Sequence, residues 1–568
     1  MRFKIPTQIG FSRMKSIKND DIMPILFDDT DLDRMFTVLF ERCVKLGETG
    51  LPRSKKDFLE NGDLNLEGKL IPALAASENL VGFDSNEGRE ILLNWVKTST
   101  LEFTTEGKTK RGEQIDYMKF LSLAMYRSGL PKSENRSSTR GIDSTVYRAI
   151  LSYVSSLPGC EKPGREIHAS VTSTSLGTGI DFEPIHYPWG SPVYNEKDEI
   201  DINTLLQMRF LEKFEAKVSK TKKKVQADLE NAVRPLEIPF SAPLDDLARD
   251  FYNMTKAFGS KSAVELLSMY KSIFSLRLYR LPIILSQHLK HATEDKKEID
   301  MNHEMFFDFS RSRKSASHRL ANESVLTDIN QASELISGLV YFREAFDMVK
   351  KNKTRFEEYN SLTPNEKIYY LSRFAKSDTA NDKAFTIIEE METYFEEKGP
   401  EGAESLEIIR ASKVDSNFDW LVSLILSDIE ERGLKSLKKW FYSVGGLKEP
   451  MNASTVAILA GDKKSMKTWH YSMSDSVLNT LLHLCFVRDN GTVIQRKEIE
   501  LSVVIEDFRK RYGILIDVPP RGSESPEDMQ AATENLAAFK GRIKQLGWFE
   551  GLSDDFDAQY ISKPAGDM

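Results

Sequence analysis

Three histidines in the middle of the chain come closest to a catalytic or metal-binding pattern. His288 and His291 are three residues apart, which places both on one face of a helix, and His303 follows with Glu294 and Glu304 nearby. Imidazole and carboxylate groups are common ligands of zinc and other divalent metals. The chain has no H-E-x-x-H pattern, so we predict a surface histidine pair and no cofactor. The three histidines remain the candidates if the protein binds a metal.

Three groups of basic residues could contact nucleic-acid phosphates. They are a lysine run within 213–224, a segment rich in Ser and Arg at 311–319, and one face of a helix near residue 540. The candidate residues are Lys220, Lys222, Lys223, Lys224, Arg311, Arg313, Lys314, Lys540, Arg542 and Lys544. Lysine and arginine bind phosphates through charge and hydrogen bonds. The alternative for the first two groups is a solvated surface, because acidic residues bracket the lysine run.

Other motifs that could support catalysis or nucleotide binding are incomplete. Residues 461–465 (GDKKS) are similar to a phosphate-binding loop but lack the spaced glycines of G-x-x-x-x-G-K-[ST], so we predict no nucleotide site there. The sequence also has no G-x-S-x-G motif for acyl transfer. We therefore identify no catalytic residue from the sequence.

The composition is typical of a soluble globular protein with several domains. Of the 568 residues 40% are hydrophobic and 29% charged, and 78 Lys+Arg against 86 Asp+Glu give a net charge of −8. These values exclude a disordered polyelectrolyte and a histone-like basic protein. No apolar run approaches the ~18 residues of a membrane helix, and the first residues do not resemble a signal peptide. We expect a cytoplasmic protein with no membrane contact.

Helical periodicity dominates the elements that must position these residues. It predicts a mostly α, multidomain protein, with small β elements in a middle connector and in a C-terminal winged-helix-like module. The predicted regions are a helical N-terminal domain over 1–165, an irregular or β connector over 166–201, a helical domain over 202–398, a mixed linking region over 399–470 and the winged-helix-like module over 471–568. At about 100 to 200 residues per domain, this number of regions suits the length.

Several segments within these regions have specific predictions. Cys43 continues a helical apolar face and should be in the core. Residues 115–124 should form a helix that stops before Pro131. The connector should contain β-like pieces such as 167–173 (IHASVTS) and one hairpin. Residues 208–233 should form an exposed or coiled helix.

The C-terminal module has the element order of a winged helix. Ser474 can cap a first helix, residues 496–511 suit a second helix that ends at Gly513, and Thr533–Leu546 suits a third. A turn at 553–555 predicts the wing. In a DNA-binding winged helix the third helix would contact DNA, but the acidic loop at 518–529 and the acidic wing would repel phosphates. A protein-binding module is the alternative.

The ending of the chain resembles a known group of proteins. Tyr512 Gly513 Ile514, Leu546 Gly547 Trp548 Phe549, Leu552 Ser553 Asp554 and Ala558 Gln559 Tyr560 Ile561 carry the resemblance. They are similar to the C-terminal modules of large accessory proteins in bacterial phage-defence islands of the methylation-associated defense and DNA phosphorothioation-dependent restriction types. The resemblance covers only this module. It implies a non-enzymatic component that acts beside separately encoded ATPases, helicases, nucleases or methylases.

We therefore expect a non-catalytic accessory or scaffold subunit of a bacterial anti-phage, restriction-like defence complex. Its expected partners are other defence proteins, such as an ATPase, a helicase or a methylase, and double-stranded DNA is a further expected contact. Two alternatives stay open. One is a metal-dependent nuclease whose site is not visible in the sequence, and the other is a self-assembling structural protein built from long helices.

Overall fold

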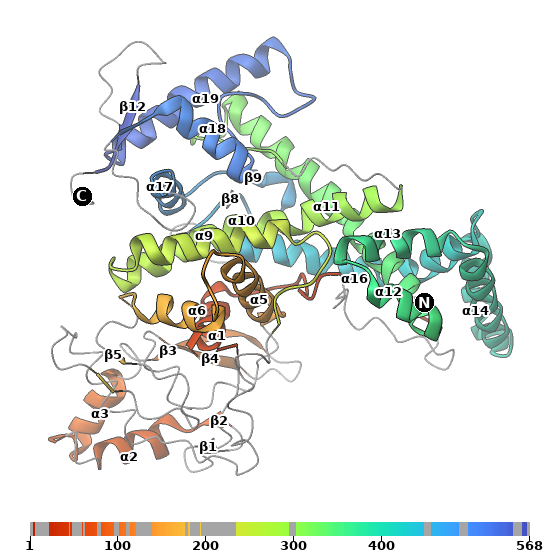
Figure 1. The fold of residues 1–568 in the computed structure, drawn as a ribbon, viewed down its shortest axis with the longest axis horizontal. Helices are drawn as coiled ribbons and strands as arrows, with labels where there is room; N and C mark the ends of the chain where they lie inside the picture. The colour runs from red at the N-terminus through yellow and green to blue at the C-terminus, as the bar shows by residue number, and fades with distance from the viewer. Residues whose placement is uncertain are drawn as a thin grey trace.

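The structure is a computed structural model (Figure 1). It describes residues 4–5, 22–44, 46–47, 59–60, 63–76, 81–95, 101–108, 114–120, 139–175, 180–181, 193–194, 234–294, 303–447, 456–487, 498–548 and 559–564. Helices dominate these residues, and the strands form two-stranded sheets. This confirms the predicted mostly α fold class.

Two long helices form the centre of the molecule. α10 (Ala263–Thr293) and α11 (Ala316–Lys350) pack against each other, and α9 (Ala242–Phe258) and α16 (Asn417–Val444) cover them. The side chains of Ser262 and Ser315 cap α10 and α11 by accepting backbone N–H groups. Most side chains of α10 between Tyr270 and Leu289 are buried, which is typical of a helix surrounded by protein. At 1.5 Å per residue, α11 is about 50 Å long.

The N-terminal helices pack on one side of this centre. α1 (Leu32–Val44), α5 (Ile142–Ser155) and α6 (Pro163–Thr172) contact one another. α5 and α6 also pack on α9, and α1 packs on α10. Cys43 on α1 is fully buried, as predicted. The remaining N-terminal elements are β1 (Leu59–Glu60), β2 (Asp63–Leu64), the π-helical turn η3 (Leu66–Leu70), α2 (Ile71–Ala75), α3 (Asn86–Trp95), β3 (Leu101–Lys108), β4 (Gln114–Phe120), β5 (Ile180–Asp181) and β6 (Val193–Tyr194).

Two predictions for this half of the chain are wrong. Of the helix expected at 115–124, residues 115–120 belong instead to β4, which pairs antiparallel with β3, and residues 121–124 lie outside the described residues. Leu101, Phe103 and Thr105 alternate with polar residues, a two-residue period that indicated a strand partner. The segment 167–173, expected to be β-like, belongs to α6, because Pro163 starts the helix and Ile167 and Val171 bury one face. The expected hairpin is present as β5 paired with β6.

An acidic helical arm extends from the far end of α11. It comprises α12 (Lys353–Ser361), α13 (Pro364–Ala375), α14 (Asp378–Glu396), the 3-10 turn η7 (Gly399–Glu401) and α15 (Ala403–Ala411). Residues 378–407 contain ten acidic residues and two lysines. Their net charge equals the −8 of the whole chain, so the rest of the chain is neutral on balance.

The C-terminal module lies on the other side of α10 and α11 (Figure 1). Its elements are β8 (Leu459–Ala460), the 3-10 turn η8 (Met466–Thr468), β9 (His470–Tyr471), α17 (Asp475–Leu484), β10 (Glu498–Glu500), α18 (Leu501–Tyr512), β11 (Ile514–Leu515), α19 (Pro526–Gln545) and β12 (Tyr560–Ser562). α17 packs on α10 and α19 packs on α11. β11 pairs in parallel with β7 (Met305–Phe306), which directly attaches the module to the segment between the long helices.

A buried charge network strengthens this attachment. Asp250 on α9 is fully buried, and its carboxylate accepts hydrogen bonds from Arg277 Nη2 on α10 at 2.6 Å and from Arg511 Nη2 on α18 at 3.4 Å. The Arg277 guanidinium also lies 4.6 Å from the centre of the Tyr512 ring. The charge of a buried carboxylate is well compensated by two arginine partners. The same carboxylate without an arginine, or a buried arginine without a carboxylate, would be a costly unpaired charge.

The caps of the module's helices agree with the sequence, but one loop does not. Ser474 caps α17 and Gly513 ends α18 in the left-handed conformation, as predicted. α19 begins at Pro526 with Ser525 as its cap, so part of the segment predicted as an acidic loop is the first turn of a helix. Residues 399–470, predicted as a mixed linking region, contain α15 and the 28-residue α16. The domain boundaries stay a prediction.

Candidate functional site

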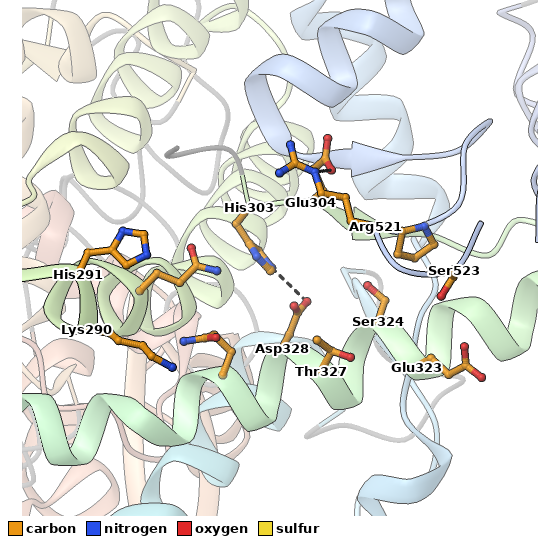
Figure 2. Close-up of a pocket in the computed structure, with 13 residues that line it drawn as sticks. Lys290, His291, His303, Glu304, Glu323, Ser324, Thr327, Asp328, Arg521 and Ser523 are labelled. Atoms are coloured by element: carbon orange, nitrogen blue, oxygen red, sulfur yellow. Dashed lines mark ion pairs between the residues drawn. The ribbon is translucent and has the colours of Figure 1, made fainter. Parts of the chain in front are cut away.

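A polar cleft lies between α10 and α11 (Figure 2). It has a volume of about 480 Å³, and its walls come from the two helices, from residues 303–304 and from the loop 520–523. All of its lining residues except Pro520 are polar. Most pockets for drug-like ligands are largely apolar, so this cleft suits a polar ligand or water.

His303 and Asp328 form an ion pair at the cleft. His303 Nε2 lies 3.1 Å from Asp328 Oδ2, and the Tyr471 hydroxyl donates to the same carboxylate oxygen at 2.5 Å. Arg280 Nη2 donates to the His303 carbonyl at 2.8 Å. Burial and the nearby charge of Asp328 raise the pKa of Tyr471, which keeps its hydroxyl protonated as a donor. The Asp328 carboxylate lies beside the imidazole, but His303 Nε2 has no hydrogen-bond partner among the described residues, so this contact alone does not orient the ring for acid–base chemistry.

The three histidines do not come together. His288 is buried and its ring stacks on Phe240 at 4.4 Å between centroids, so the predicted surface pair is wrong for this residue. Burial, with a smaller effect of His291, lowers the pKa of His288 to about 4. His291 and His303 both line the cleft. Within the described ranges no group of three or more His, Cys, Asp or Glu side chains could hold a metal ion.

Two exposed ion pairs stand at the rim of the cleft. Lys290 Nζ lies 3.0 Å from Glu334 Oε2, and Arg521 Nε lies 3.5 Å from Glu304 Oε2. Exposed pairs of this kind contribute little stability and exchange partners easily. The cleft can therefore present cations to a polar ligand without losing much folding energy.

A second group of candidate residues gathers at the N-terminal end of α11. The loop 310–315 precedes this helix, and the turn 461–469 lies beside it because Asn322 Nδ2 donates to the carbonyls of Lys467 at 3.0 Å and Trp469 at 2.5 Å. The rings of His318 and His470 pack 4.1 Å apart. We call six residues of these two segments the basic surface: Arg311, Arg313, Lys314, Lys463, Lys464 and Lys467.

Most acidic side chains around the basic surface are occupied. The exception is Asp462, an exposed residue of the turn whose Oδ1 accepts the Lys464 backbone N–H at 2.9 Å. Asp475 pairs with Arg311 at 2.8 Å and with Arg542 at 2.7 Å. Asp528 and Glu323 both pair with Arg319. By contrast, four exposed cations of the surface form no ion pair with any described residue: Arg313, Lys314, Lys464 and Lys467. The surface therefore has an excess of positive charge.

The candidates on α19 differ in exposure. Arg542 is only 5% exposed, and its guanidinium donates to Asp475 Oδ1 and to the Met473 carbonyl. This arginine contributes to packing inside the module. Lys540 is half-buried, and burial lowers its pKa. Lys544 is exposed. Nucleic-acid contact by α19 stays a prediction that now depends mainly on Lys544.

Comparison with protein families identifies the chain. The family model described as methylation-associated defense system protein MAD7 matches residues 12–564. The chain belongs to this family. No curated protein and no solved structure matches it.

MAD7 family membership confirms one of the two defence types expected from the sequence and corrects the extent of the resemblance. The similarity was expected in the C-terminal module alone, whereas the MAD7 match spans nearly the whole chain. In the part of the MAD7-family chain that the structure describes, no helix has the length and apolarity needed to cross a membrane.

Some predicted features lie outside the described residues of this MAD7-family chain. They are Lys220, Lys222, Lys223 and Lys224, the helix at 208–233 and the wing at 553–555.

The sequence did not reveal some of the candidate residues. Asp328 and Tyr471 had no motif, because they approach His303 only through folding. Lys464 and Lys467 were visible in the GDKKSMK segment but were considered only as a nucleotide loop.

Proposed function

We propose that the chain is a non-catalytic accessory subunit of the methylation-associated defense system, which acts as a scaffold for protein partners and contacts double-stranded DNA. The observation that carries this proposal is the buried attachment of the C-terminal module to the long helices through β7, β11 and Asp250. The attachment fixes the module relative to α11, which carries the acidic arm at its far end. A scaffold needs this kind of fixed arrangement.

The topology of the module supports a winged helix. α17, β10, α18, α19 and β12 occur in the winged-helix order, with β11 inserted between α18 and α19 and paired with β7, and β10 pairs antiparallel with β12. The Ser562 backbone N–H also donates to the Trp548 carbonyl at 2.8 Å, next to the proposed wing. Modules of this type bind DNA or protein, so the topology is compatible with either contact.

Family membership supports other proteins of the same defence system as partners. We propose an ATPase, a helicase or a methylase among them. The test is affinity purification of the tagged full-length chain, co-expressed with the other proteins of its system and treated with a nuclease. We expect at least one of these proteins to co-elute in fixed stoichiometry. Elution of the chain alone would contradict the scaffold role, and loss of the partner on nuclease treatment would show that DNA merely bridges the two.

The cleft favours an enzyme as a second candidate function. His291, His303 and Glu304 line it together with Asp328, and the sequence had left a metal-dependent nuclease open. The test is plasmid cleavage by the purified chain with Mg²⁺ or Mn²⁺, compared with a His303→Asn variant. Cleavage that the variant lacks would support the enzyme and overturn the non-catalytic proposal. Absence of cleavage by both proteins would remove the nuclease.

A further inference from the structure

We propose that the basic surface binds the phosphate backbone of duplex DNA without reading its sequence. This inference rests on the proposed function and adds the binding surface and the form of nucleic acid to it. Three of the six residues come from 311–314, and the other three come from a turn about 150 residues later in the chain. Folding on α11 brings them into one surface.

The charge balance of the surface suits a polyanion. Arg313, Lys314, Lys464 and Lys467 are exposed, and none forms an ion pair with a described residue. The Asp475 carboxylate is shared by Arg311 and Arg542, so it does not neutralise these four. Binding of cations to phosphates releases counterions from DNA, which makes such a surface an effective backbone contact.

The absence of an exposed apolar anchor argues against an acidic protein as the partner. Strong protein–protein contacts depend on a few large side chains at the centre of the interface. Large hydrophobic side chains with substantial exposure do occur among the described residues, but none lies in 310–318 or 461–470. Trp469 in the second segment and the adjacent Tyr471 are fully buried.

The aromatic groups of this region also argue against single-stranded nucleic acid. Proteins that bind single strands commonly stack the bases on exposed aromatic rings. Here the rings of His318 and His470 pack on each other, and the half-buried Tyr442 is covered by the Lys463 ammonium at 4.5 Å. Neither arrangement offers a free ring to a base. Duplex DNA, whose bases are already stacked, needs none.

The position of the cations on loops indicates contact without sequence reading. Reading of bases in the major groove requires a helix or a two-stranded ribbon that enters the groove. Three of the six residues lie in the loop before α11. The other three lie in the turn that joins the two-residue strands β8 and β9 and contains the 3-10 turn η8, so neither segment offers a long helix or ribbon to enter a groove. Their long side chains can still reach phosphates along the edge of a groove.

The test measures binding of a labelled duplex of about 30 base pairs by fluorescence anisotropy, at about 50 and about 200 mM salt. The variant replaces Arg313, Lys314, Lys464 and Lys467 by alanine. If each cation contacts one phosphate, these four contacts alone weaken wild-type binding about 150-fold between the two salt concentrations. The variant should lose most of this dependence, with a slope of log K against log salt reduced by about 3 to 4.

A matched control removes the same number of positive charges at the far end of α11. It replaces the exposed Lys351, Lys353 and Arg373 and the half-buried Lys367 by alanine, and we expect wild-type affinity and salt slope. Equal loss of binding in both variants would show that only total charge matters and would overturn the assignment. Unchanged binding in the test variant would overturn it as well.

Competitors decide the class of partner. We expect unlabelled duplex to compete regardless of sequence, whereas single-stranded DNA and polyglutamate of equal charge should compete at least about tenfold less well. Equal competition by polyglutamate would assign the surface to an acidic protein instead. Co-purification of the test variant with its defence partners separates the two proposals. If the test variant loses DNA binding but still co-purifies with its partners, the result supports the basic surface as the DNA-binding site. If the wild-type chain does not co-purify with any partner, the scaffold role is wrong, and the DNA-binding proposal is judged by the anisotropy data alone.

Discussion

Arg542 and Lys544 are two residues apart on α19, yet they lie in different environments. Arg542 points into the module and holds Asp475 and the Met473 carbonyl, whereas Lys544 faces solvent. The sequence grouped both as DNA contacts, because helical spacing does not show which face a neighbouring segment covers. His288 shows the same limit, since its spacing from His291 did not reveal its stacking on Phe240.

The difference between these two residues predicts opposite mutational effects. Arg542→Ala should destabilise the C-terminal module by about 1 to 3 kcal/mol, because a buried carbonyl and a partly buried carboxylate lose a charged donor. Lys544→Ala should change stability by less than about 0.5 kcal/mol. Urea unfolding followed by circular dichroism would measure both. Equal midpoints for the two variants would contradict the buried role of Arg542.

The low pKa of His288 predicts a stability that depends on pH. Burial lowers this pKa from 6.5 to about 4. The unfolded chain therefore takes up a proton as pH falls through about 6.5, while the folded chain does so only near 4. This group costs no stability above about pH 6.5, and between there and about pH 4 it removes up to about 3 kcal/mol.

His288→Phe tests this dependence, because it keeps a ring beside Phe240 and removes the ionisable group. Thermal unfolding midpoints of the variant and the wild type are compared at about pH 5 and about pH 7.5. The variant should gain stability relative to the wild type at the lower pH. A constant difference at the two values would show that His288 does not carry the effect.

At the scale of elements, local signals in the sequence were enough for some helices and not for others. Ser474, Gly513 and the apolar spacing of α17 and α18 predicted those helices, because caps and periodicity act over a few residues. The pairing of β3 with β4 and the burial of α6 depend on other segments. Local spacing alone therefore predicted a helix where β4 forms and a strand where α6 forms, and both predictions were wrong. The candidate cleft was unpredictable for the same reason, because its walls come from four segments.

Gly513 joins α18 to β11 at a point where no side chain fits. Its φ is +65°, and a Cβ atom there would lie 1.9 Å from the His303 carbonyl oxygen. Gly513→Ala should therefore destabilise the protein by more than the roughly 1 to 2 kcal/mol of the left-handed conformation alone. It should also displace His303 from Asp328.

Gly541 supplies the control within the same module. It lies inside α19, and a Cβ atom there would meet nothing within 4 Å. Gly541→Ala should raise stability by about 0.5 to 1 kcal/mol, because alanine favours the helix. Thermal unfolding of the two variants measures the contrast. A similar loss in both would show that Gly513 has no special conformational requirement.

At the scale of the whole molecule, Asp250 connects segments about 260 residues apart. It binds Arg277 on α10, which is buried, and Arg511 on α18, which is half-buried. The sequence contains no sign of this link, and the predicted regions treated residues 202–398 and 471–568 separately. The contacts among α10, α11, α17 and α19 show how closely these regions pack.

Removal of this carboxylate should loosen the module. Asp250→Ala leaves the buried Arg277 guanidinium with only the more exposed Asp246 as an acidic partner and removes one of the two carboxylates beside the half-buried Arg511, and it should cost about 3 to 5 kcal/mol. Hydrogen exchange should accelerate across 501–548 more than in α12 and α13. Asp246→Ala is the milder control, because this carboxylate is 38% exposed and lies 3.3 Å from Arg277. Equal protection of 501–548 in the wild type and the Asp250 variant would contradict the link.

The acidic arm and the basic surface give the molecule an electrical polarity. They adjoin opposite ends of α11, which the packing of Lys383 on the Met348 carbonyl and of Asn322 on the Lys467 carbonyl shows. A separation of about 50 Å is several times the screening length of about 8 Å at physiological salt, so each end acts on its surroundings independently. A negatively charged macromolecule that approaches by diffusion is repelled from one end and attracted to the other. The chain should therefore be oriented before first contact, with the helices α14 and α15 directed away from the polyanion.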